Sequence, residues 1–254
     1  TYTGGTAPEQ WTPIGDKRYR YTGTFDGNGH TVSGLYINNS SEYQGLFGHL
    51  DEGGTIQNLG VINSYIRADS DTGSIVGYVC GSSDNRAKIT GCFSAATVIT
   101  TGSSSYVGGI AGDARYTNIE NCYNTGSVHG NGTYSSTGGV AGEAYSASIT
   151  NCYNTGTVSG GEHSATGGEK VDAGGVVGQV YSSSVTNCYS TGAVSGGENA
   201  DVGGVAGYVY TSGTVTNCYF LEGTASAGVG NGVGGTTSLT AAEMTGPDAL
   251  DSMS

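Results

Sequence analysis

The stretch Gly138-Gly139-Val140-Ala141-Gly142, together with the Asn151-Cys152-Tyr153 that follows it, decides the fold because both segments recur along the chain. The first segment returns at 108–112, 174–178 and 203–207, with weaker copies at 45–48 and 74–77. The second returns at 121–123, 187–189 and 217–219, with a weaker copy at 91–93. The spacing within each repeat is nearly constant, and the variation in length falls between the Tyr and the next Gly-Gly. A repeat of about 30 residues with one elastic connection predicts a solenoid.

Composition alone would favour disorder, because 48 of the 254 residues are glycine and the formal net charge is −13. The repeats override that interpretation, since stacked coils bury a continuous core that no single coil could form. With 21 acidic against 8 basic residues, the surface would repel phosphate backbones, so nucleic-acid binding is excluded. No apolar run reaches the ~18 residues that cross a bilayer, so we expect no membrane insertion by this segment.

Alternation with period two predicts that the first segment is a β-strand. One inward column then contains the apolar residues that follow the Gly-Gly: Leu46, Ile75, Ile110, Val140, Val176 and Val205. The column of Asp113 and Glu143 must face water, since unpaired carboxylates are costly to bury. This register places one apolar column outside as well: Phe47, Val76, Ala111, Ala141, Val177 and Ala206. That exposed stripe, bordered by Tyr78 and Tyr208, is either the contact surface of the protein or a column of residues that simply suit a tight β face.

The second segment breaks its alternation at asparagine, which predicts a corner, because Asn tolerates left-handed backbone angles. Stacked Asn side chains can bond to the coils above and below. A short third strand carries Val98, Val128, Val158 or Val194 inward. The predicted fold is therefore all-β, a right-handed parallel β-helix with three short strands and one variable loop per coil. Its handedness follows from the rule for parallel crossovers.

The ends of the chain differ from its middle. Thr240-Ala241-Ala242-Glu243 forms a capping box that predicts a short helix, ended by Gly246-Pro247, over the open edge of the last coil. We expect an N-terminal cap and lead-in coil over 1–44, the repeat β-helix over 45–223 and a C-terminal cap over 224–254. The chain begins within its pattern, which suggests a piece of a longer protein.

Five of the six cysteines occupy one position in successive coils: Cys92, Cys122, Cys152, Cys188 and Cys218. Stacked side chains point the same way, which is wrong for an unstrained disulfide, and one column cannot surround a zinc ion. We expect buried free thiols, with a disulfide or a metal as alternatives. The aromatic residues that follow form an outward column: Phe93, Tyr123, Tyr153, Tyr189 and Tyr219. That column is either a stabilising ladder or a platform for sugar rings or a partner protein.

Carboxylates supply the candidate chemistry. Asp113 and Glu143 occupy equivalent positions of adjacent coils, so they should lie about 5 Å apart, the separation that retaining glycosidases use. A carbohydrate-active enzyme, a hydrolase or a lyase, is the alternative function, although catalysis would need a cleft rather than an open face. Acidic residues also gather in the variable connections: Asp69, Asp71, Glu162, Glu169, Asp172, Glu198 and Asp201. We expect these to be solvated; the alternative is that calcium bridges neighbouring loops, and we expect no other cofactor.

The repeated Gly-Gly-Val-Ala-Gly with Asn-Cys-Tyr-x-Thr-Gly resembles the GLUG-motif repeats of bacterial exported and cell-surface proteins. The stretch from Trp11 to Gly15, the one from Tyr21 to His30 and the one from Thr240 to Met244 also look like parts of that family. The resemblance implies an adhesin-like surface protein or an accessory region of an immunoglobulin A-cleaving metallopeptidase. No His-Glu-x-x-His is present, so no peptidase activity carries over. We therefore expect a non-enzymatic, extracellular module, an adhesin or a rigid spacer, whose partner is a surface glycan or protein.

Overall fold

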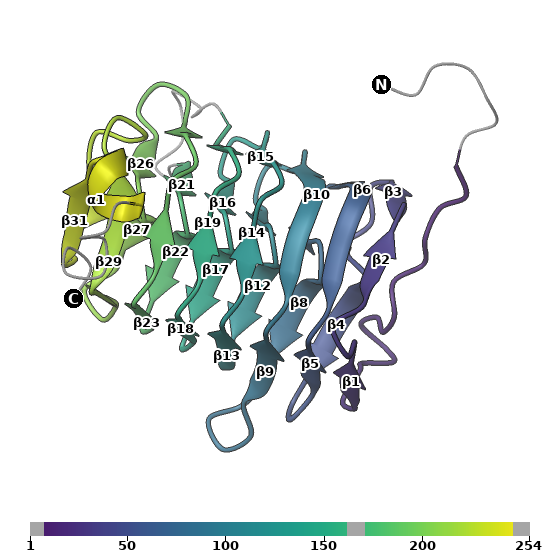
Figure 1. Ribbon diagram of the computed structural model, residues 1–254. Coiled ribbons are helices and arrows are strands. Elements are labelled where there is room, and N and C mark those ends of the chain that lie inside the picture. The colour runs from purple at the N-terminus through teal and green to yellow at the C-terminus, as the bar shows by residue number, and fades with distance from the viewer. Residues whose placement is uncertain (1–7, 162–170, 246–254) are drawn as a thin grey trace.

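The computed structural model describes residues 8–161 and 171–245 and has the form of a stack of parallel β-coils (Figure 1). Every strand pairing in these two ranges is parallel, and each strand pairs with its equivalent in the coil before or after. The predicted parallel β-helix is confirmed. Among the described residues, no helix is long and apolar enough to span a membrane.

The strands of the described residues form four sheets that run along the stack. Sheet A contains β4 (Phe47–Asp51), β8 (Val76–Cys80), β12 (Ala111–Arg115), β17 (Ala141–Tyr145), β22 (Val177–Tyr181), β27 (Ala206–Val209) and β30 (Val229–Gly232). Sheet B contains β1 (Thr24–Asp26), β5 (Thr55–Gln57), β9 (Ala87–Thr90), β13 (Thr117–Glu120), β18 (Ser148–Thr150), β23 (Ser184–Thr186) and β28 (Thr214–Thr216). Sheet C contains β2 (Thr31–Ser33), β3 (Tyr36–Asn38), β6 (Gly60–Ala68), β10 (Phe93–Thr100), β14 (Tyr123–Asn124), β15 (Val128–Gly130), β19 (Tyr153–Asn154), β20 (Val158–Ser159), β24 (Tyr189–Ser190), β25 (Val194–Ser195), β29 (Cys218–Leu221) and β31 (Thr236–Leu239). Sheet D contains β7 (Thr72–Gly73), β11 (Tyr106–Gly108), β16 (Ser136–Gly138), β21 (Asp172–Gly174) and β26 (Asp201–Gly203).

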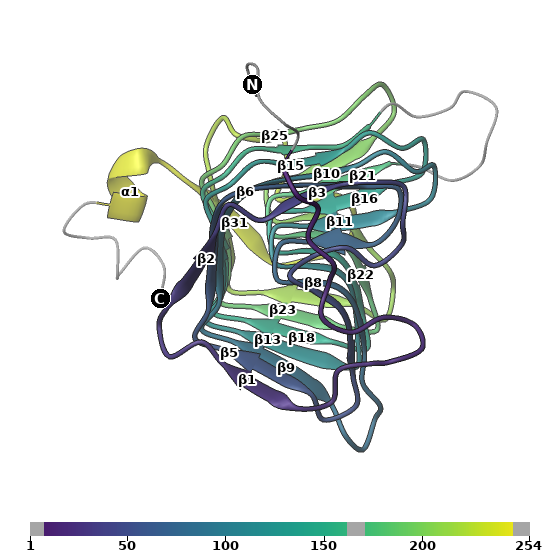
Figure 2. The same cartoon turned by 90° about the vertical axis from the view of Figure 1, so that its right-hand side faces the viewer.

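A complete coil passes through sheets D, A, B and C in turn, and the view along the stack shows that sheet D folds back beside sheet A (Figure 2). The sequence predicted three strands and a loop per coil, and missed the strand of sheet D. That strand is short and lies directly before the Gly-Gly, in the connection whose length varies. Because this strand turns back beside sheet A, the outline of each coil has a crease between sheets A and D.

The asparagine corners have the predicted backbone geometry. Asn121, Asn151 and Asn187 have φ angles of 54°, 55° and 55°, in the left-handed region. Their side chains form the predicted ladder, since Asn151 Nδ2 donates to Asn121 Oδ1 at 3.4 Å and Asn187 Nδ2 donates to Asn151 Oδ1 at 3.3 Å. These corners turn each coil from sheet B into sheet C.

The interior contains more columns than the sequence predicted. The column that begins with Leu46 and Ile75 is buried, as predicted. However, the neighbouring column, predicted to be an exposed contact stripe, is also fully buried; its members are Phe47, Val76, Ala111, Ala141, Val177 and Ala206. Strict alternation fails here because the chain turns from sheet D into sheet A at this point, so consecutive residues can both pack into the core. The predicted contact stripe was wrong.

The cysteine column lies where predicted. Cys92, Cys122, Cys152, Cys188 and Cys218 are buried, and all six cysteines are free thiols. Burial raises the pKa of the Cys152 thiol well above its usual range, which favours the unreactive form.

The predicted C-terminal helix is α1 (Ala241–Thr245), and its capping box is formed, with the backbone N–H of Glu243 donating to Thr240 Oγ1 at 3.3 Å. The side chains of residues 241–243 are exposed, and the helix lies beside the stack rather than over its end (Figure 2). The prediction that this helix covers the open edge of the last coil was therefore wrong. Gly246-Pro247, Glu162 and Glu169 lie outside the described residues.

Candidate binding groove between sheets A and D

The fold between sheets A and D contains a groove of about 430 Å³, which we call the tyrosine–carboxylate groove. It is lined by Ser104, Tyr106, Tyr134, Ser136, Asp172, Gln179, Asp201, Tyr208, Tyr210 and Asn231. Four of these residues are tyrosines, two are carboxylates, two are amides, and none is Lys, Arg or His. Among the described residues, the groove therefore combines aromatic surface with hydrogen-bond acceptors and is lined by no basic side chain.

The register of the repeats builds both walls of the groove. In sheet D the paired residues are Tyr106, Ser136, Asp172 and Asp201. In sheet A the paired residues are Asp113, Glu143, Gln179, Tyr208 and Asn231. The repeats thus place one polar position from each wall in every coil, and the sequence varies which side chain occupies it.

Glycine lets the two sheets approach each other. A Cβ atom added at Gly112 would lie 2.5 Å from both the carbonyl oxygen of Gly77 and the backbone nitrogen of Thr72. These distances are too short for any residue with a side chain. The last glycine of each Gly-Gly-x-x-Gly segment is therefore a requirement of close backbone packing between sheets A and D.

Hydrogen bonds join the two walls. Asn231 Nδ2 donates to Asp201 Oδ2 at 3.0 Å, and Gln179 Nε2 donates to Asp172 Oδ2. Ser136 is 1% exposed, and within the described residues its hydroxyl has no hydrogen-bond partner. A buried hydroxyl without a partner is unfavourable, so a ligand group that bonds to Ser136 would gain free energy on binding.

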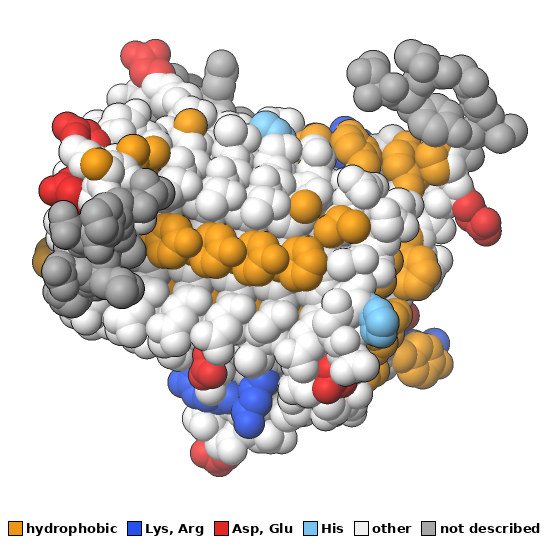
Figure 3. All heavy atoms as spheres, in the orientation of Figure 1, with side chains coloured by type: hydrophobic (Ala, Val, Ile, Leu, Met, Phe, Trp, Pro, Cys, Tyr) orange, Lys and Arg blue, Asp and Glu red, His pale blue; other side chains and the backbone are white. Residues whose placement is uncertain are grey.

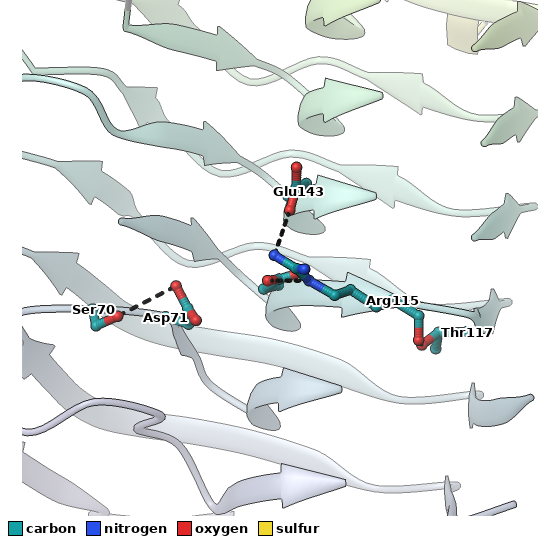
Figure 4. A network of polar contacts seen from close by, with 6 residues as sticks. Ser70, Asp71, Arg115, Thr117 and Glu143 are labelled. Atoms are coloured by element: carbon teal, nitrogen blue, oxygen red, sulfur yellow. Dashed lines mark hydrogen bonds and ion pairs between the residues drawn. The ribbon is translucent and has the colours of Figure 1, made fainter. Parts of the chain in front are cut away.

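A buried cluster of charged side chains lies between the same two sheets, in the coils nearer the N-terminus (Figure 4). Arg115 Nε lies 2.8 Å from Asp113 Oδ2, and Arg115 Nη2 lies 3.4 Å from Glu143 Oε2. Asp113 is 1% exposed and Glu143 is 7% exposed, so the prediction that both face water was wrong. Their column does point away from the core, but sheet D covers it, and Arg115 supplies the opposite charge beside the two buried carboxyl groups.

Burial raises the pKa of Asp113 well above its usual range and raises the pKa of Glu143, with like-charge repulsion from Glu143 adding to the effect on Asp113. Burial also raises the pKa of Asp71, from the adjacent coil, to about 6. Arg115 opposes these shifts for all three carboxyl groups. One cation therefore faces three carboxyl groups, and the cluster holds protons more tightly than exposed carboxylates would.

The ion cluster does not have the geometry of a glycosidase. Both Asp113 and Glu143 bond to the same guanidinium, and the two carboxyl groups also hydrogen-bond to each other, so no room for a scissile bond is left between them. Asp113 is also shielded from any substrate by its burial. Arg115 stacks near two aromatic rings, 5.7 Å from the centroid of Tyr78 and 5.6 Å from that of Tyr145, which fixes its position.

The acidic connections divide into two groups. Asp71, Asp172 and Asp201 are buried at 8%, 2% and 8% exposure and face the fold between sheets A and D, not solvent as predicted. Asp69 is half-buried and accepts a hydrogen bond from Thr101 Oγ1 at 2.5 Å, while Glu198 is exposed. Among the described residues, no three His, Cys, Asp or Glu side chains are grouped so that they could hold a metal ion.

The outer aromatic column forms a ladder on sheet C. The ring centroids of Phe93–Tyr123, Tyr123–Tyr153 and Tyr153–Tyr189 are 5.0, 4.8 and 4.9 Å apart, and the rings are parallel within 5°. Figure 3 shows a row of hydrophobic side chains across this face. Because each ring covers the face of the next, the ladder exposes ring edges, which favours stabilisation between coils over stacking of sugars. Tyr219 continues the same register beside Tyr189.

The sequence marked Tyr208, Asp172 and Asp201 as site candidates but did not show that they lie together. It missed Tyr106, Ser136, Gln179 and Asn231, and it placed Tyr78 on an open face, whereas Tyr78 stacks on Tyr43 at 4.6 Å beside the ion cluster. The sequence did contain a signal for these residues: the position two before each Gly-Gly is polar and lies in a short segment with the pattern of a strand. Only the pairing of that strand with sheet A forms the groove.

Comparisons with known proteins agree with this architecture. The GLUG motif matches residues 103–128, 133–159, 171–195 and 198–224. A Gly-rich membrane protein of Evansella cellulosilytica is 37% identical over 79 residues, and halomucin of Haloquadratum walsbyi is 44% identical over 66 residues. These matches cover 30% and 26% of this chain but only 9% and 1% of the relatives.

A solved structure shares the fold. The crystal structure of an immunoglobulin A1 protease-like protein from Bacteroides ovatus superimposes with a TM-score of 0.69 over 94% of this chain and 76% of the other, at 22% identity. At that identity the likeness concerns the fold alone. Four successive segments of this parallel β-helix, between residues 103 and 224, are thus GLUG-motif repeats.

Proposed function

We propose that this chain is a non-catalytic module of a cell-surface protein that binds a surface glycan in the tyrosine–carboxylate groove. A surface location is supported by the GLUG repeats and by relatives described as a membrane protein and a halomucin. We also propose that the parent protein is bacterial and secreted, and that this module serves either in adhesion or as a rigid spacer.

The lining of the groove is the observation that carries the proposal. Saccharide ligands present many hydroxyl donors and an apolar face of ring C–H groups, and they are bound by aromatic surfaces with a few fixed polar groups. The groove supplies four tyrosines together with carboxylate and amide side chains held by bonds across it. Its carboxylates would repel an anionic chain, so the proposed ligand is a neutral glycan or one that carries amino groups.

Protein partners are less well supported. The apolar stripe that would have formed a protein interface is buried, and the outer tyrosine ladder shows ring edges. A polysaccharide-cleaving activity is disfavoured because the two candidate carboxyl groups, Asp113 and Glu143, are buried and bond to Arg115 and to each other.

A glycan array probed with the whole chain tests the proposal, with each hit quantified by titration calorimetry. Tyr208→Ala and Gln179→Ala should each weaken binding at least tenfold, since both side chains line the groove. Tyr219→Ala is the matched control, because it removes a tyrosine from sheet C, outside the groove. Binding of no saccharide, or equal losses in the control, would contradict the proposal.

A further inference from the structure

A second hollow, of about 960 Å³, lies near the N-terminal end of the stack and shares no lining residue with the groove. Its walls come from two segments far apart in sequence, 10–18 and 39–44, so it exists only because the lead-in packs beside the connection that precedes β4. The indole of Trp11 forms part of the wall. Trp11 is the sole tryptophan of the chain.

Trp11 is exposed yet held in place. Its backbone N–H donates to Tyr36 O at 2.8 Å, and its indole Nε1–H donates to Leu46 O at 3.1 Å. Trp11 is nevertheless 38% exposed, whereas tryptophan side chains are ordinarily largely buried. An oriented ring with its polar edge already bonded and its apolar surface open is prepared to stack against a ligand at little cost in side-chain entropy.

The remaining wall is polar and balanced in charge. Lys17 forms an ion pair with Glu42, and its ammonium lies 5.0 Å from the centroid of the Tyr43 ring. Gln10 is anchored to Asn38 by two hydrogen bonds of 2.9 and 2.8 Å, which fixes the rim beside Trp11. A wall that carries hydroxyls, amides and both signs of charge favours a ligand with many hydroxyls and no net charge.

We propose that this hollow is a second saccharide-binding site, specific for neutral sugars, in which Trp11 is the stacking platform and Lys17 donates hydrogen bonds to sugar hydroxyls. The site stands independently of the tyrosine–carboxylate groove, which lies on other strands. If both sites are occupied by one chain of sugars or by two neighbouring chains, attachment gains from multivalency.

The lone tryptophan gives the test its own signal. We would titrate the whole chain with neutral oligosaccharides (cellohexaose, mannohexaose, maltohexaose and xylohexaose) and record tryptophan emission and acrylamide quenching. At least one sugar should change the emission saturably and reduce quenching. Tyr208→Ala should leave that response intact, which separates this site from the groove.

Two variants, each made in the Tyr208→Ala chain so that the groove does not contribute, complete the experiment, with calorimetry as the readout because Trp11 itself is replaced. Trp11→Ala should weaken binding of the responding sugar at least tenfold, whereas Trp11→Phe, which keeps an aromatic ring, should retain most of the affinity. Circular dichroism and thermal melting check that both variants fold. Absence of any emission or quenching response across the panel, or an unchanged affinity in a folded Trp11→Ala variant, would overturn the proposal.

Discussion

Replacement of Asp71 by Asn should stabilise the protein at neutral pH. The pKa of Asp71 rises from 3.8 to about 6 in the folded chain, chiefly through burial. Between those two pKa values the folded chain holds more protons than the unfolded chain, so the free energy of unfolding falls as the pH rises from about 4 to about 6. The loss at pH 7.5 amounts to about 3 kcal/mol, since each pKa unit is worth about 1.4 kcal/mol.

Asn removes this loss while it keeps a side-chain oxygen for the bond that Asp71 accepts from the backbone N–H of Tyr106. We therefore expect Asp71→Asn to raise the free energy of unfolding by about 1–3 kcal/mol at pH 7.5 but by only about 0.2 kcal/mol at pH 3.5, where Asp71 is protonated in the folded chain and about two-thirds protonated in the unfolded chain. Asp84→Asn, in an exposed loop, is the matched control.

Urea denaturation followed by circular dichroism, at pH values from 3.5 to 8, measures the difference between each variant and the natural chain. The difference for Asp71→Asn should grow between pH 4 and pH 6 and then level off. A difference that does not vary with pH, or that grows equally in Asp84→Asn, would refute the assignment of a raised pKa to the buried Asp71.

Other perturbations test the rest of the structure. Arg115→Met leaves Asp113 and Glu143 buried without their cation and should lower the free energy of unfolding by about 2–4 kcal/mol at pH 7.5; Asp113→Asn in the same chain should recover part of that loss. Ala111→Arg, which an exposed column would tolerate, should prevent folding because Ala111 is fully buried, and a native circular dichroism spectrum would disprove that burial. Asn151→Ala should cost about 1–2 kcal/mol through the left-handed φ of 55°, and Asn151→Gly should cost less; equal losses would mean that the side-chain ladder dominates. The five stacked thiols should react with a thiol reagent only after denaturation, and EDTA should leave the melting temperature unchanged, whereas a fall would identify calcium at the acidic connections.

The amino-acid sequence determined the features of this protein that depend on local chemistry repeated at a fixed spacing. Asn at each corner adopts a left-handed backbone angle, and the Cys and Tyr that follow it point to opposite sides of one strand, so their columns were predictable. The parallel coils followed from the same repeat, because equivalent residues that stack must also pair. Even the cysteine column and the capping box of Thr240 and Glu243 needed no knowledge of distant segments.

The tertiary structure decided which faces of the strands meet water. A column that points away from the core is exposed only if no other segment covers it, and sheet D, formed by the connection of variable length, covers the column of Asp113 and Glu143. The same fold-back brings Asp172 to Gln179 and Asp201 to Asn231, and so creates the groove. Trp11 likewise becomes part of a hollow only where residues 10–18 pack beside residues 39–44. These sites depend on contacts between segments that the repeat places independently, which is why no single repeat contains them.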